Sequence, residues 1–190
     1  MATPADHLIR RHRYSVDDYY CMAAAGVLRP DERVELIDGE IIDMTPIGSR
    51  HAAVVTMLNQ RLISVLGTAA IVSVQNPVWL GTHSEPQPDI ALLKPRSDFY
   101  EAAHPSPGDV LVIIEVADSS AAYDRDVKLP LYARHGIPGV WLVDLATQKL
   151  TVYGAPADGT YTTVTTAEDL TRMPIPGLPD TNVDLGPLLQ

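Results

Sequence analysis

The chain has 190 residues, a length that suits one globular domain with a sizeable core. Hydrophobic residues make up 46% and charged residues 20% of it, which argues against a disordered chain. No apolar run approaches the roughly 20 residues that span a bilayer, and no apolar segment follows the basic N-terminal residues as in a secretory signal. A single cysteine, Cys21, excludes an internal disulfide, so we expect a cytoplasmic protein without a membrane partner.

The formal net charge of -10 limits how the chain could bind nucleic acid. Proteins that bind nucleic acid usually carry a basic surface, because neutralising phosphates releases counterions. A contact with nucleic acid here would need a local patch, and the densest candidate is the segment 7–13, His-Leu-Ile-Arg-Arg-His-Arg. A solvated terminus is an alternative of at least equal weight. We therefore expect a flexible basic N-terminal tail at 1–13 and a single domain at 14–190.

The predicted elements begin with a helix and a hairpin. Ser15, followed by an acidic residue three positions later, is typical of a helix N-cap and predicts a helix over 15–25. The segment 33–44 places two β-rich runs around Asp38 and Gly39, both of which tolerate the positive φ of a type I′ turn. We therefore expect a β-hairpin there.

Helical and strand patterns follow along the rest of the chain. Apolar residues at helical spacing predict an amphipathic helix over 51–66. A second helix is expected from 118 to 135, kinked or broken at Pro130 because proline lacks the backbone N–H. A meander of strands, a crossover helix and a further strand pair predict an α+β, α/β-like fold with a mixed sheet and helices on both faces. The expected strands are 69–74, 78–80, 89–93, 110–116, 139–144 and 150–153.

Two acids lie at the ends of strongly apolar strands. Asp89 opens one strand, and Glu115 follows four consecutive aliphatic residues in another. An unpaired buried carboxylate is costly, and two carboxylates on neighbouring strands repel each other unless something neutralises them. A hard divalent cation such as Mg²⁺ does so, because it binds through one or two carboxylates and keeps several waters. The alternative is that each acid pairs with an arginine or caps a loop.

A lysine follows these acids on the next helix. Asp124 and Lys128 lie at positions i and i+4. They form either a surface ion pair, worth about 0.3–0.5 kcal/mol, or a pair in which Lys128 points back toward the strand ends. In the second arrangement the ammonium could orient a water or stabilise the charge that develops on a phosphate.

Several sequence blocks together carry a resemblance to a known family. With them the chain resembles the PD-(D/E)XK nuclease superfamily and, within it, the bacterial restriction endonucleases of the Uma-two type. The similarity covers most of residues 14 to 155, and the joint occurrence of the blocks is more specific than any one of them. The blocks are Gln87-Pro-Asp89, Ile114-Glu-Val-Ala-Asp-Ser-Ser120, Tyr123-Asp-Arg-Asp-Val-Lys128-Leu-Pro-Leu-Tyr132, Arg33-Val-Glu-Leu-Ile-Asp-Gly-Glu40 and Gly136-Ile-Pro-Gly-Val-Trp-Leu-Val-Asp144.

The resemblance implies a restriction-endonuclease-like fold and a metal site. Asp89 and Glu115 would be the metal-binding acids, and the carbonyl of Val116 would be an additional ligand. Glu35 matches the family's N-terminal acid and would bind the metal directly or through water. The implied cofactor is Mg²⁺, with Mn²⁺ as a substitute.

The catalytic lysine departs from the superfamily pattern. That pattern places it two positions after the second acid, where this chain has Ala117. The resemblance implies that Lys128 on the following helix is its counterpart. The implied reaction is metal-assisted hydrolysis of a phosphodiester bond, in which Lys128 helps to position the attacking water.

Two polar residues are further candidates. Gln75 lies on a strand expected next to Asp89, where it would contact water or phosphate; a hydrogen bond at the edge of the core is the stronger interpretation. His51 begins the long helix, and a phosphate contact at the helix N-terminus and a plain capping role are equally supported.

Two functions remain open. The first is a Mg²⁺-dependent endonuclease acting on nucleic acid, with DNA as the expected substrate. The second is a catalytically inactive nuclease-like domain that acts as a binding or interaction module. The net charge and the alanine at position 117 favour the second, whereas the joint presence of Asp89, Glu115 and Lys128 favours the first. Apolar strands that contain tryptophan are compatible with a homodimer.

Overall fold

The computed structural model describes residues 11–118 and 120–189. The chain forms two units, Met1–Thr45 with Leu80–Pro86, and Pro46–Trp79 with Gln87–Gln190. We call them the N-terminal unit and the sheet unit. Of the expected tail at 1–13, residues 1–10 lie outside the described part, and residues 11–13 are exposed. A single domain over 14–190 stays a prediction.

The N-terminal unit contains the expected helix and hairpin. Helix α1 (Val16–Ala24) begins after Ser15, whose side chain and that of Asp18 form a reciprocal capping box. Strands β1 (Val34–Ile37) and β2 (Glu40–Asp43) pair antiparallel. The turn between them uses Asp38 and Gly39 at φ 48° and 79°, as a type I′ turn requires. Both predictions are confirmed.

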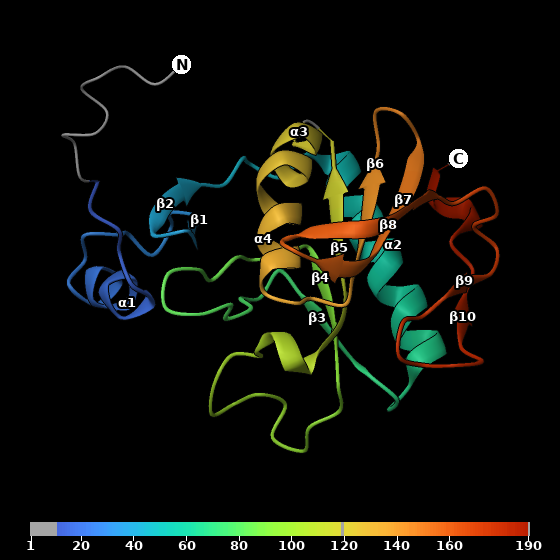
Figure 1. Cartoon of the computed structure of the whole chain (residues 1–190), viewed down its shortest axis with the longest axis horizontal. Helices are drawn as coiled ribbons and strands as arrows, with labels where there is room; N and C mark the ends of the chain where they lie inside the picture. The colour runs from blue at the N-terminus through green and yellow to red at the C-terminus, as the bar shows by residue number, and fades with distance from the viewer. Residues whose placement is uncertain (1–10, 119, 190) are drawn as a thin grey trace. The chain divides into compact units, whose positions relative to one another are not determined.

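The sheet unit is built on a six-stranded mixed sheet in the order β3-β4-β5-β6-β7-β8 (Figure 1). Strands β3, β4 and β5 form an antiparallel meander, β5 and β6 are parallel, and β7 and β8 continue antiparallel. The predicted α+β fold with a mixed sheet is confirmed. The strands are β3 (Ile71–Val74), β4 (Ile90–Leu93), β5 (Val110–Ala117), β6 (Gly139–Asp144), β7 (Lys149–Ala157) and β8 (Thr160–Thr166).

Helices cover both faces of this sheet. Helix α2 (Ser49–Leu66) packs its buried stripe, with Leu58 and Leu62 fully buried, in one apolar cluster with alternate residues of β5 such as Val112 and Ile114. Helix α4 (Leu129–Arg134) lies on the other side of the central strands (Figure 1). Successive side chains of a strand lie on opposite faces of the sheet. The side chain of Glu115, at an odd-numbered position, therefore points away from the face that α2 covers.

The crossover from β5 to β6 is three short helical pieces. Helix α3 (Ala121–Tyr123) leads into a π-helical turn η2 (Asp124–Lys128), and α4 follows directly. We expected an irregularity at Pro130. Pro130 instead occupies the first turn of α4, where its missing N–H is tolerated, and the irregular turn lies just before it. Single π turns insert an extra residue into a helix and are frequent at functional sites.

Other parts of the sheet unit differ from the sequence predictions. The expected strand at 78–80 is absent, because this segment has no ladder partner and Trp79 N–H donates instead to the Pro105 carbonyl at 2.9 Å. Strand β8 was not predicted. The C-terminal segment also contains a short pair of strands that was not predicted. The remaining elements are η1 (Pro107–Asp109), β9 (Met173–Pro174), β10 (Asn182–Val183) and η3 (Gly186–Leu189).

Candidate active site

The register of β4 and β5 places Asp89 beside Glu115. Ile90 pairs with Ile114, so the residue before Ile90 lies opposite the residue after Ile114 in this antiparallel pair. The Asp89 backbone N–H donates to Glu115 Oε2 at 3.3 Å. The two acids that the sequence placed on neighbouring strands are therefore adjacent.

Asp89 is held by donors from three elements. Its Oδ2 accepts the Val116 backbone N–H of β5 at 2.9 Å and lies 3.0 Å from His51 Nε2 in the first turn of α2. Its Oδ1 accepts the Gln75 side-chain amide at 3.3 Å. Gln75 follows β3 with φ 51°, a left-handed conformation that is costly for a residue with a side chain and is common at functional sites.

Glu115 is only 3% exposed and is held from the helical crossover. The Tyr132 hydroxyl donates to Glu115 Oε1 at 2.6 Å, and Lys128 Nζ lies 3.3 Å from the same oxygen. Burial raises the pKa of Glu115 to about 8, and the Lys128 ammonium opposes that rise. The nearby carboxylates of Asp124 and Asp89 raise the pKa further.

Lys128 reaches this site although the position two residues after Glu115 is alanine. Its side chain is 6% exposed, and it lies at the end of the π turn, so the interpretation of Asp124 and Lys128 as a surface ion pair is wrong. Both residues are buried. The helical crossover therefore supplies the ammonium group near Glu115 that the side chain of Ala117 cannot supply.

The donor atoms suit a hard divalent cation. Among the described residues, Asp89 Oδ1 and Glu115 Oε2 each accept one hydrogen bond, at the long distance of 3.3 Å, so each retains lone-pair capacity. Across the described residues, no group of three or more His, Cys, Asp or Glu side chains is arranged to hold a metal. A cation here would rest on two carboxylates, completed by backbone oxygen or water, which is how Mg²⁺ is commonly held.

Two further predicted metal ligands stay predictions. Val116 contributes its N–H to Asp89, and the use of its carbonyl as a ligand stays a prediction. Glu35 is buried in β1 of the N-terminal unit, close enough to Tyr19 for its charge to help raise the pKa of that phenol, after burial and Glu85. Its role as a metal ligand also stays a prediction.

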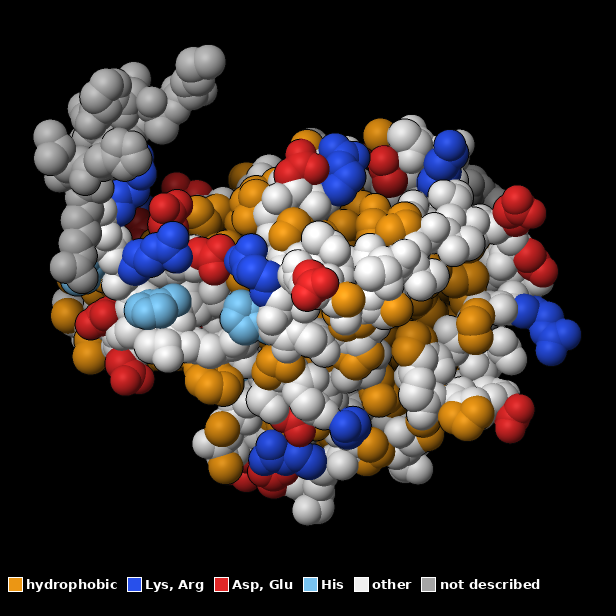
Figure 2. Space-filling model, viewed as in Figure 1, with side chains coloured by type: hydrophobic (Ala, Val, Ile, Leu, Met, Phe, Trp, Pro, Cys, Tyr) orange, Lys and Arg blue, Asp and Glu red, His pale blue; other side chains and the backbone are white. Residues whose placement is uncertain are grey.

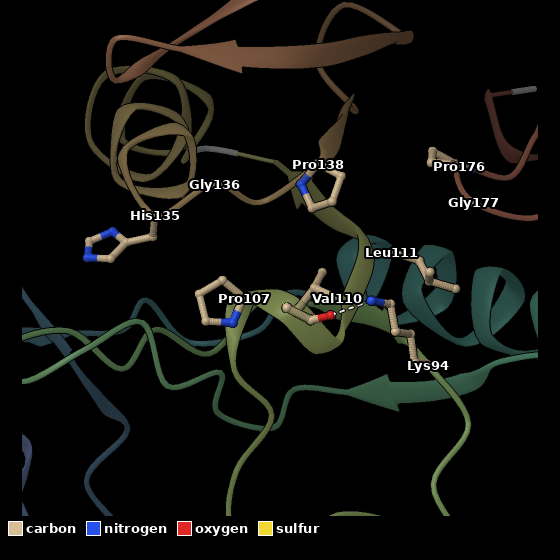
Figure 3. Close-up of a pocket in the computed structure, with 10 residues that line it drawn as sticks. Lys94, Pro107, Val110, Leu111, His135, Gly136, Pro138, Pro176 and Gly177 are labelled. Carbon is tan, nitrogen blue, oxygen red and sulfur yellow. Dashed lines mark hydrogen bonds between the residues drawn. The ribbon is translucent and has the colours of Figure 1, made fainter.

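The hollow in the sheet unit shown in Figure 3 lies elsewhere. It measures about 440 Å³, and residues around it include Lys94, Pro107, Val110 and Pro138. No acid lines it. Val110 and Glu115 are five residues apart on β5, or about 16 Å at 3.3 Å per residue. This hollow is therefore separate from the acid pair.

Two residues near Glu115 received no site role from the sequence. Tyr132 was noticed only as part of the family blocks, and Asp124 only as a partner of Lys128. A signal was available, because Asp124, Lys128 and Tyr132 recur every four residues and so share one helical face. Tyrosine on such a face is usually a core residue, so spacing alone could not show that its hydroxyl meets a carboxylate.

Comparisons with known proteins agree with this fold. The Uma2 family model, described as "Putative restriction endonuclease", matches residues 16–186. The crystal structure of a "putative nuclease belonging to DUF820" from Anabaena variabilis superposes with a TM-score of 0.69, covering 92% of this chain and 97% of that chain at 18% identity. A search of curated proteins finds no match. The family match spans most of the sequence, and the chain belongs to the Uma2 family, a nuclease family with a restriction-endonuclease-like fold.

Proposed function

We propose that this chain is a divalent-cation-dependent endonuclease that hydrolyses phosphodiester bonds, with DNA as its substrate. The observation that carries the proposal is the trio of Asp89, Glu115 and Lys128. The two acids are adjacent across β4 and β5, and the lysine ammonium lies 3.3 Å from Glu115. Membership of a nuclease family supports the same reaction class.

The trio matches the demands of phosphodiester hydrolysis. A Mg²⁺ ion bound by the two carboxylates would supply a Lewis acid for the scissile phosphate and lower the pKa of water at the site. The protein's own part is to hold those carboxylates in place, and the hydrogen bonds from Val116, His51 and Gln75 do so for Asp89. Oriented carboxylates bind a cation more tightly than mobile ones.

In addition to the charge of the cation, the site contains a positive charge from the protein, the ammonium group of Lys128. Its ammonium lies almost fully buried, where an electrostatic interaction is stronger than in water. From there it would orient the attacking water and stabilise the negative charge that develops on the phosphate. This assigns Lys128 to the chemical step and the two acids to cation binding.

DNA binding must overcome the repulsion between the DNA phosphates and the net negative charge of the protein. The net charge is -10. On the face shown in Figure 2, basic and acidic side chains of the described residues are interspersed, and no broad basic area appears among them. We propose that local contacts, including the exposed Arg11 and Arg13, carry the phosphate recognition.

The proposal is tested by cleavage of plasmid, linear and single-stranded DNA, and of RNA, in Mg²⁺, Mn²⁺ or EDTA. We expect cation-dependent cleavage that falls at least about 100-fold in D89N, E115Q and K128M. D89N and E115Q should also lose Mn²⁺ binding in calorimetry, whereas K128M should retain it. D158N is the matched control, because Asp158 is exposed in the β7–β8 turn and asparagine tolerates its φ of 50°.

Equal trace cleavage by wild type and all the variants would show that the activity is a contaminant. That result would favour the alternative of an inactive nuclease-like module. Cleavage of RNA but not DNA would keep the mechanism and correct the substrate.

A further inference from the structure

We propose that Tyr132 is a positioning residue for cation binding: its hydroxyl fixes one oxygen of Glu115 and so turns the other toward Asp89. This inference rests on the proposed function, because it assigns a role around the same acid pair. The family resemblance assigned no role to Tyr132.

The contact has the geometry of a strong hydrogen bond. Tyr132 is fully buried on α4, and its hydroxyl lies 2.6 Å from Glu115 Oε1. An O–H donor to a carboxylate typically gives distances of about 2.5–2.7 Å and a bond roughly twice as strong as one between neutral groups. The phenol is therefore a primary anchor of this carboxylate.

The three donors divide between the two oxygens of Glu115. Tyr132 and Lys128 both contact Oε1, at 2.6 and 3.3 Å, whereas Oε2 accepts, among the described residues, the backbone N–H of Asp89 at 3.3 Å. Lys128 and Tyr132 lie one helical turn apart, so a single face of the crossover holds Oε1. Oε2 is left on the Asp89 side with the weaker contact, and this is the oxygen offered to a cation.

Loss of the Tyr132 hydroxyl would loosen the orientation of the Glu115 carboxylate without creating a cavity in the core. The terminal torsion of a glutamate side chain has broad minima, so its carboxylate rotates easily when an anchor is removed. Phenylalanine would keep the buried ring of Tyr132. Removing a hydrogen bond that orients a metal ligand typically lowers metal affinity about 10–100-fold.

The chain offers a matched control outside the site. The Tyr161 hydroxyl donates to the Ile137 carbonyl at 3.0 Å, and Tyr161 lies on β8. Tyr161 is half-buried, whereas Tyr132 is fully buried, and burial raises the pKa of the Tyr161 phenol. Y161F also removes a phenol hydrogen bond, here to a neutral carbonyl, that touches neither acid. General effects of losing a phenol hydroxyl appear in both variants, and effects on cation binding only in Y132F.

The experiment measures three quantities for wild type, Y132F and Y161F. These are the Mn²⁺ dissociation constant by calorimetry, the rate of plasmid cleavage against Mg²⁺ concentration, and the melting temperature in EDTA. We expect Y132F to bind Mn²⁺ about 10-fold or more weakly and to recover most of its cleavage rate at saturating Mg²⁺. Y161F should match wild type in both cation-dependent readouts.

A rescue variant keeps the test decisive should Y132F not fold. Replacement of Tyr132 by 4-aminophenylalanine retains the ring and a donor at the same position, and should restore most of the Mn²⁺ affinity. If Y132F folds and binds Mn²⁺ as tightly as Y161F, or if the rescue variant folds but binds Mn²⁺ about 10-fold or more weakly than wild type, the positioning role is wrong while the nuclease proposal stands. If wild type neither binds Mn²⁺ nor cleaves, both are wrong.

Discussion

At the residue scale, the site depends on an acid in an unfavourable place. Glu115 is buried among aliphatic side chains, and only hydrogen bonds and Lys128 compensate for that burial. Burial of such a carboxylate costs stability, whereas the same group can serve as a ligand in a cation site. The free-energy cost of burying Glu115 should therefore be measurable in the metal-free protein.

The stability of the metal-free protein should depend on pH through Glu115. Its pKa is about 8 in the folded chain against 4.5 ordinarily, so between these values the folded state holds a proton that the unfolded state releases. The free energy of unfolding should consequently fall as pH rises through this window, by up to about 1.4 kcal/mol per pH unit. Urea unfolding in EDTA from pH 5 to 8 measures this.

E115Q supplies the reference for that measurement, because its amide does not titrate. The difference in unfolding free energy between wild type and E115Q should shift in favour of E115Q as pH rises. A difference that stays constant with pH would show that Glu115 does not carry this titration.

At the scale of elements, the hairpin turn shows how one backbone position specifies local structure. Gly39 has φ 79°, and a Cβ added there would lie 2.6 Å from Arg13 Cβ. Gly26 has a similar φ of 73° but no atom within 4 Å of such a Cβ. Both substitutions to alanine should cost about 1–2 kcal/mol for the left-handed backbone, and G39A more because of the clash. Hydrogen exchange of β1 and β2 amides in G39A, and thermal unfolding of both variants, measure this; equal losses would contradict it.

Elements with a strong periodic pattern were predictable from the sequence. Helix α2 and strands β4 and β5 have clear apolar patterns, and their register alone brings Asp89 to Glu115. Strand β8 was missed because its residues, Thr160–Thr166, are mostly threonine and show no apolar alternation. The run at 78–80 was misjudged because a short apolar segment does not reveal whether it has a ladder partner.

The helical crossover marks the limit of sequence reasoning at this site. The spacing of Asp124 and Lys128 fits both a solvent-exposed pair and a buried one. Both residues lie in a π turn, and no sequence pattern announces such a turn. No pattern in the sequence shows that Tyr132, on the helix that follows, contacts Glu115.

At the scale of the whole molecule, no helix within the described residues is long and apolar enough to cross a membrane.

Electrostatics limits how the chain could bind DNA. With a net charge of -10, the chain should bind DNA through few phosphate contacts and with a shallow dependence on salt. R11A/R13A should reduce the slope of log K against log salt by up to about 2 without changing Mn²⁺ affinity. An unchanged slope, measured by fluorescence anisotropy in Ca²⁺, would remove these arginines from the interface.

The central claim is that Asp89 and Glu115 together form the cation site. Crystals grown with Mn²⁺ test it most directly, because anomalous scattering locates the ion without reference to activity. We predict one strong peak within coordination distance, about 2.0–2.4 Å, of both Asp89 Oδ1 and Glu115 Oε2, and its loss in E115Q. A peak bound elsewhere, or none at saturating Mn²⁺, would contradict the account.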